Sequence, residues 1–81
     1  PGIYAALAFA KEHYTAYTVE TLQSKVLEKL TSIPEAVTEY AVVSDADTLA
    51  PLETWCEADH AVLCVALYLG ENRLIDNILL Y

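Results

Sequence analysis

Apolar residues in the first third of the chain recur at the spacing of an α-helix rather than at the spacing of a strand. From Ile3 to about Tyr14 they return every three or four positions, and alanine, the best helix former, is frequent. After a short connection, Thr18 is expected to be the N-cap of a second amphipathic helix, whose apolar stripe runs from Val19 to residue 33. Pro34 should end it, because the residue before a proline is pushed out of helical geometry.

Later segments are β-branched and aromatic. Residues 39–43 predict a strand, and residues 44–53 predict a polar connection. The run from His60 to Leu69 is apolar on both faces, which is typical of a central strand covered on both sides. A turn at 70–72 then leads into a last strand from Arg73 to about Leu80. The order predicts one α+β domain over residues 1–81, with two N-terminal helices packed on a small three-stranded antiparallel sheet.

Composition adds three constraints to this picture. The chain has 81 residues, 56% of them hydrophobic, so one small domain should have apolar surface left for a neighbour. Twelve acidic and four basic residues give a net charge of −8, which argues against nucleic-acid or anionic-membrane partners. No apolar run is long enough to span a membrane. The start at Pro1 without a methionine is expected to be an internal chain end.

Three residues at intervals of four, Cys56, His60 and Cys64, form the first candidate site. On a helix they would share one face and a metal site would be conceivable. In a strand beginning at His60, four residues span about 13 Å, which is too far for one metal ion, so no metal is expected. The two cysteines instead predict buried thiols in a reducing, cytoplasmic compartment, and Cys64 in particular is expected to be structural rather than nucleophilic.

An acidic group in the polar connection, Asp45, Asp47 and Glu53, is the second candidate. It lacks the glycine turn and the later bidentate glutamate of an EF-hand loop. Asp47 is therefore expected to cap a turn by accepting a backbone N–H. His13 and His60 lie near element ends and are expected to be surface residues.

Residues 70–77 read Gly-Glu-Asn-Arg-Leu-Ile-Asp-Asn. This stretch resembles the end of the pantothenate synthetases, or pantoate–β-alanine ligases, which close on Gly-x-x-Arg-Leu-Ile-Asp-Asn. Upstream, residues 39–45 and the Thr-Leu-Ala-Pro-Leu segment at 48–52 resemble the same family, as do residues 61–70 and the Ile-Tyr-Ala-Ala-Leu start at 3–7. The resemblance covers essentially the whole chain and implies that it is the C-terminal domain of such an enzyme.

For the parent enzyme, the resemblance implies condensation of pantoate with β-alanine through a pantoyl-adenylate, using ATP and Mg²⁺. The family's His-x-Gly-His and Ser-Arg-Asn motifs belong to an N-terminal nucleotide-binding catalytic domain and its boundary, and neither motif is in this chain. The C-terminal domain acts in the family as a lid over the cleft. This chain is thus expected to carry no catalytic residue, to bind no cofactor by itself and to have that N-terminal domain as its partner.

Arg73, Asp76 and Asn77 are the polar residues of the family-like stretch. Arg73 and Asp76 should point to opposite faces of a strand. The favoured hypothesis is that all three are structural and tie the last strand to its neighbours; the other is that Arg73 reaches the nucleotide cleft and binds substrate. A different function also stays open, namely a stand-alone acidic interaction module without catalytic activity.

Overall fold

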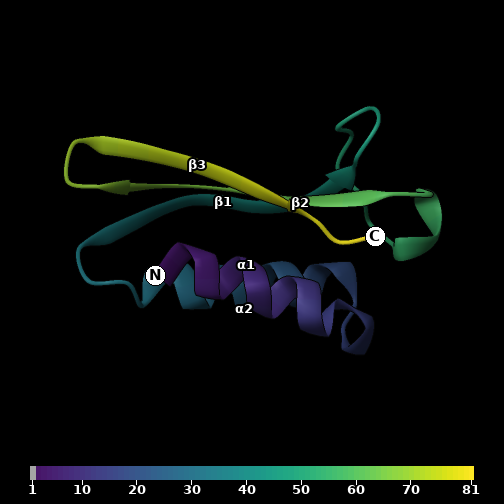
Figure 1. Ribbon diagram of the computed structural model, residues 1–81, viewed down its shortest axis with the longest axis horizontal. Helices are drawn as coiled ribbons and strands as arrows, with labels where there is room; N and C mark the ends of the chain where they lie inside the picture. Colours follow the sequence, from purple (N-terminus) through teal and green to yellow (C-terminus); the bar gives the residue numbers. More distant parts are fainter. Residues whose placement is uncertain (1) are drawn as a thin grey trace.

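Two helices lie side by side against one face of a three-stranded antiparallel sheet (Figure 1), which confirms the predicted α+β class. The computed structural model describes residues 2–81, and Pro1, to which the expectation of an internal chain end was tied, lies outside the described residues. In chain order the elements are α1 (Gly2–His13), the 3-10 turn η1 (Tyr14–Ala16), α2 (Val19–Thr31), β1 (Ala36–Asp45), the 3-10 turn η2 (Trp55–Glu57), β2 (Ala61–Leu69) and β3 (Asn72–Leu79). Neither helix in this range is long and apolar enough to cross a membrane.

The sheet order is β1-β2-β3, so the most apolar strand is central, as predicted. Leu69 pairs with Asn72 across a two-residue loop, and Gly70 at its first position has φ +63°. That is where a type II′ hairpin loop needs glycine, because a side chain strains a positive φ. The expectation that β2 would be covered on both sides is wrong for the described residues: the helices cover one face only, and Tyr68 of β2 is 38% exposed on the other.

The core lies between the helices and the inner face of the sheet, which is the face toward the helices. The α2 positions 19, 22, 26 and 30 follow the helical period and are buried, and alternate residues of β2 are buried in the same core. Burying one such leucine contributes about 1.5–3 kcal/mol. The largest fully buried side chains are Leu22, Leu30, Leu63, Leu67, Val19, Val26, Val43 and Val65.

Local polar contacts fix the ends of these elements. Thr18 is the N-cap of α2, as predicted, and its Oγ1 accepts the Thr21 N–H at 3.1 Å. At the other end of the chain, the Tyr81 hydroxyl donates to the Trp55 carbonyl at 2.8 Å, and the Trp55 indole N–H donates to the Tyr17 carbonyl at 2.8 Å. The C-terminal residue, the η2 turn and the connection between the helices are thereby held together.

Replacing the N-cap should lower stability measurably. Thr18→Ala removes the acceptor for the Thr21 N–H, and such a loss costs about 0.5–2 kcal/mol, or several degrees of melting temperature in a domain of this size. The matched control is Thr15→Ala at an exposed position of η1. Thermal unfolding followed by circular dichroism would show equal melting temperatures for the two variants if the cap contributed nothing.

Candidate functional site

The side of the sheet that faces away from the helices, here called the outer face, is apolar and uncovered. Because Leu63, Val65 and Leu67 of β2 are buried against the helices, the alternate residues of β2 and their cross-strand partners form the outer face. Its exposed large side chains are Val37 (66%), Ile75 (58%), Leu79 (49%) and Tyr68 (38%). Several exposed large apolar side chains on one face of a small domain are typical of an interaction site.

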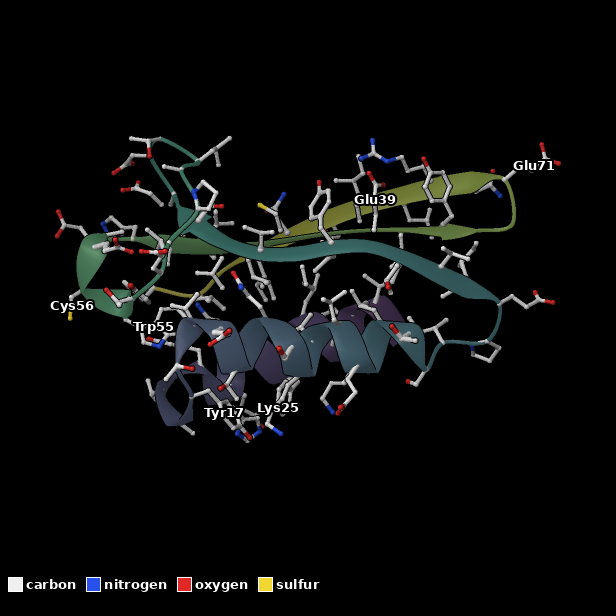
Figure 2. The ribbon with its side chains drawn as sticks, turned by 180° about the vertical axis from the view of Figure 1, so that it is seen from behind. Tyr17, Lys25, Glu39, Trp55, Cys56 and Glu71 are labelled. Carbon is white, nitrogen blue, oxygen red and sulfur yellow. The ribbon has the colours of Figure 1, made fainter. Side chains whose placement is uncertain are left out.

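A β-bulge in β1 shapes the outer face. Thr38 pairs with Leu67 and Tyr40 pairs with the adjacent Ala66, so Glu39 is an extra residue in the strand. A bulge redirects the side chains around it, and here both Glu39 and Tyr40 reach the outer face. Figure 2 shows Glu39 on the side of the sheet away from the helix layer.

Arg73 and Glu39 form an ion pair across the central strand. Arg73 Nε donates to Glu39 Oε1 at 2.8 Å, and a second guanidinium nitrogen donates to Oε2 at 3.2 Å. The hydrogen bond and charge of Glu39 raise the pKa of Arg73 further. Both side chains are about two-fifths exposed, at 42% and 39%, so the pair is two-pronged and specific in geometry but screened by solvent. It connects β1 and β3, which are not neighbours in the sheet.

Sequence reasoning selected Arg73 but missed Glu39. The signal was available: Arg73 is the one arginine of the chain, and Glu39 is a lone acid at the start of an apolar strand segment. The bulge that brings them together has no clear signature in the sequence.

Asp76 and Asn77 lie on the outward edge of β3. The Asp76 carboxylate accepts the backbone N–H of Asn77 at 2.8 Å, and Lys11 Nζ donates to the Leu79 carbonyl at 2.9 Å. Both contacts occupy backbone groups that would otherwise be open at a sheet edge, which discourages pairing with another strand. Arg73 and Asp76 belong to opposite faces, in agreement with the strand alternation.

The chain's four basic side chains all lie against partners within the chain. Arg73 binds Glu39, and Lys11 binds C-terminal carbonyls. Lys25 Nζ lies 5.3 Å from the centre of the Tyr17 ring, and Lys29 Nζ lies 4.3 Å from that of Phe9. In residues 2–81, a phosphate group would have to compete with these internal partners for each lysine and for the arginine.

The structure does not bring the cysteine and histidine candidates together as a metal site. Cys56 lies in η2, His60 just before β2, and Cys64 in the middle of β2; no group of three or more metal-binding side chains occurs in the described range. Cys64 is half-buried, and burial raises the pKa of its thiol, which disfavours the nucleophilic thiolate. The expectation of two buried thiols is wrong for Cys56, because η2 is a surface turn that leaves its side chain exposed.

In the acidic connection, the capping residue is Asp45 and not Asp47. Asp45 Oδ1 accepts the N–H groups of Asp47 at 2.8 Å and Thr48 at 3.2 Å. The prediction failed because Asp45 ends β1 and thus stands at the first position of the turn, from which a side chain reaches the following amides.

Glu57 caps the η2 turn, a role that sequence reasoning missed. Its Oε1 accepts the N–H groups of Glu53 at 2.6 Å and Thr54 at 2.9 Å, completing a capping box with Thr54. These backbone hydrogen bonds lower the pKa of Glu57 below its ordinary value of 4.5. The Thr-x-x-Glu spacing at 54–57 was the available signal.

Comparison with known proteins identifies the family. The family model described as pantoate-beta-alanine ligase matches residues 1–79. The chain belongs to the pantoate–β-alanine ligase family. The resemblance of the Arg-Leu-Ile-Asp-Asn stretch is thereby confirmed.

Relatives of this ligase family are considerably longer than the chain. A pantothenate synthetase of Porphyromonas gingivalis is 37% identical over 78 residues, which cover 96% of this chain and 28% of the relative. A bifunctional pantoate ligase/cytidylate kinase of Trichodesmium erythraeum is 39% identical over 83 residues, which cover 96% of this chain and 15% of the relative. The crystal structure of pantothenate synthetase from Thermus thermophilus superimposes with a TM-score of 0.85 at 32% identity, over 100% of this chain and 29% of that one.

Breaking the ion pair tests whether Arg73 is structural. Arg73→Ala and Glu39→Gln should each lower the melting temperature of the chain by a few degrees, less at high salt because the pair is partly exposed. The melting temperature of the double variant should fall little further than that of the less stable single variant, because each single change already removes the interaction. Additive losses would mean that the pair is not coupled. In the full-length ligase, a large rise in the KM for ATP with an unchanged melting temperature would instead assign Arg73 to the nucleotide site.

The capping carboxylate of Glu57 should make stability depend on pH. Its pKa is lower in the folded state than in the unfolded state, so its contribution is present above about pH 4.5 and is lost as the pH falls through the folded value. Glu57→Gln should therefore reduce the melting temperature at neutral pH and converge with the wild type in acid. The control is Glu53→Gln, which removes a neighbouring exposed carboxylate. A constant difference between Glu57→Gln and wild type at all pH values would contradict the assignment.

Proposed function

We propose that this chain is the C-terminal domain of a pantothenate synthetase and that its outer face packs over the cleft of an N-terminal catalytic domain as a lid. One observation supports this most strongly: a chain matching only 28% of its P. gingivalis relative leaves an apolar sheet face uncovered. The partner of the outer face is then the larger part of the same enzyme.

The chemistry of the family explains what such a lid would contribute. Pantoate is activated as an acyl-adenylate, a mixed anhydride that water hydrolyses, before the amine of β-alanine displaces AMP. Closing an apolar surface over the cleft excludes water until the amine arrives. ATP and Mg²⁺ are held by the remainder of the enzyme, because the cations of this chain are engaged with internal partners.

A stand-alone acidic interaction module would also use an exposed apolar face. The coding sequence upstream of Pro1 separates the two proposals. A His-x-Gly-His motif followed by Ser-Arg-Asn would favour the ligase domain, and a start codon immediately before Pro1 would favour the module.

A charged residue on the outer face should impair the full-length ligase without unfolding the domain. Ile75→Lys should leave the melting temperature of the 81-residue chain within a few degrees of wild type, because Ile75 is 58% exposed. In the full-length enzyme it should lower kcat/KM for ATP-dependent pantothenate formation at least about tenfold, equivalent to about 1.4 kcal/mol of lost interaction. The 81 residues alone should form no pantothenate.

Leu49→Lys provides the matched control, because Leu49 is 64% exposed in the connection after β1. It should retain full activity. Turnover by the 81 residues alone would contradict the assignment as a non-catalytic domain. Equal activity of Ile75→Lys, Leu49→Lys and wild type would contradict the lid role of the outer face.

A further inference from the structure

A second uncovered apolar surface lies at the opposite side of the sheet, beside the first turn of α1. It is a groove with a volume of about 730 Å³ between that turn, the end of α2 and the β2–β3 hairpin. Leu69 and Leu74 form its roof from the hairpin, and Ile33 and Pro34 form a wall after α2. Figure 1 shows the hairpin projecting past the beginning of α1, so the helix does not extend under the hairpin end.

The polar groups of the groove are already satisfied. Ser32 Oγ donates to the Lys29 carbonyl at 2.7 Å, and Lys29 Nζ lies over the Phe9 ring. In the described residues no buried side-chain nitrogen or oxygen lacks a hydrogen-bond partner. A polar metabolite would therefore find few groups to orient it, whereas apolar side chains would find a matching surface.

Gly2, the first described residue, lies against one wall of this groove. The α1 backbone packs directly on the neighbouring wall: a methyl group added at Gly2 would meet Ile33 Cγ1 at 2.7 Å and Cδ1 at 2.8 Å. Gly2 itself also lines the groove, so the described part of the chain begins at the edge of the groove. The relatives are more than three times as long as the matched segment, so a longer protein has polypeptide available for this position.

We propose that the segment immediately preceding Pro1 in the full-length ligase fills this groove with apolar side chains and completes the core under the β2–β3 hairpin. The proposal rests on the proposed function in one respect, namely that the chain is the C-terminal part of a longer enzyme. The groove segment would then hold the hairpin end, and with it the Arg73 end of the outer face, in position.

Cysteine accessibility in three proteins tests the proposal. They are the 81-residue chain, the same chain carrying the twenty natural residues before Pro1, and the full-length enzyme, all with Cys56→Ser and Cys64→Ala. Leu74→Cys probes the groove, and Glu12→Cys is the control, because the Glu12 side chain is 78% exposed near the other end of α1. The readout is the rate of reaction with a maleimide, with Leu69→Cys as the alternative probe if Leu74→Cys does not fold.

The rate at Leu74→Cys should fall at least about tenfold in both longer proteins, because covered positions react only through local opening, and the rate at Glu12→Cys should not change. Equal rates at Leu74→Cys in all three proteins would overturn the proposal. So would protection in the full-length enzyme but not in the extended chain, which would assign the groove to another part of the enzyme. A reaction rate at Leu74→Cys in the 81-residue chain that falls as the protein concentration rises would also overturn it, because a second copy of the chain would then cover the groove.

Pantothenate formation by the full-length enzyme is measured separately. Protection of Leu74→Cys in an enzyme that forms no pantothenate would contradict the proposed function and support the proposal for the groove. Pantothenate formation by the full-length enzyme, with no protection of Leu74→Cys in the extended chain, would support the proposed function and contradict the proposal for the groove.

Discussion

Packing of the helix layer, with α2 lying against β1, onto the inner face of the sheet is the interaction on which the rest of this structure depends. Leu63 and Leu67 on the inner face of the central strand and Leu22 and Leu30 of α2 belong to one core, and all four are fully buried. A chain of 81 residues has room for one such core, so both helices are used on one side of the sheet. The consequence is a sheet with one dry face and one uncovered face, and the second of these is the part that points to function.

The outer face has a defined arrangement of polar and apolar side chains. The bulge at Glu39 interrupts the alternation of β1 and lets an acid and a tyrosine share the outer face, and Arg73 crosses β2 to meet that acid. The ion pair lies on the same face as the exposed side chains of Val37 and Ile75. It fixes the positions of the Arg73 and Glu39 side chains on an otherwise apolar surface. Its net stabilisation is small because it is screened; its contribution is to geometry.

Much of the fold could be predicted from the sequence because local patterns and the global fold agree. The helical stripe from Val19, the Thr18 cap, and the Gly70 turn each have a local signature, and each is found in the structure. The prediction that both faces of β2 are covered was wrong because the sequence pattern shows only that a strand is apolar on both faces. The pattern is the same whether the second face is covered within the chain or by something outside it. Asp45 replaced Asp47 as a cap because the choice depends on where β1 ends, a boundary that periodicity defines poorly.

For the candidate site, sequence reasoning supplied Arg73 but not its partner. Glu39 is 34 positions away, and the two meet only because a bulge shifts the register of β1 against β2. Long-range pairs of this kind depend on the pairing register of the strands, and the bulge that shifts the register here has no clear signature in the sequence. The family, in contrast, could be recognised from residues 70–77 because that stretch is specific in itself.

The most direct test of the central claim, that the outer face is buried in the complete enzyme, is hydroxyl-radical footprinting of the full-length ligase and of the 81-residue chain. The claim predicts that oxidation of Tyr68 and Ile75 slows markedly in the full-length enzyme while oxidation of exposed Leu49 does not change. Equal oxidation rates at Tyr68 and Ile75 in the two proteins would contradict the claim, because the outer face would then be open to solvent in both.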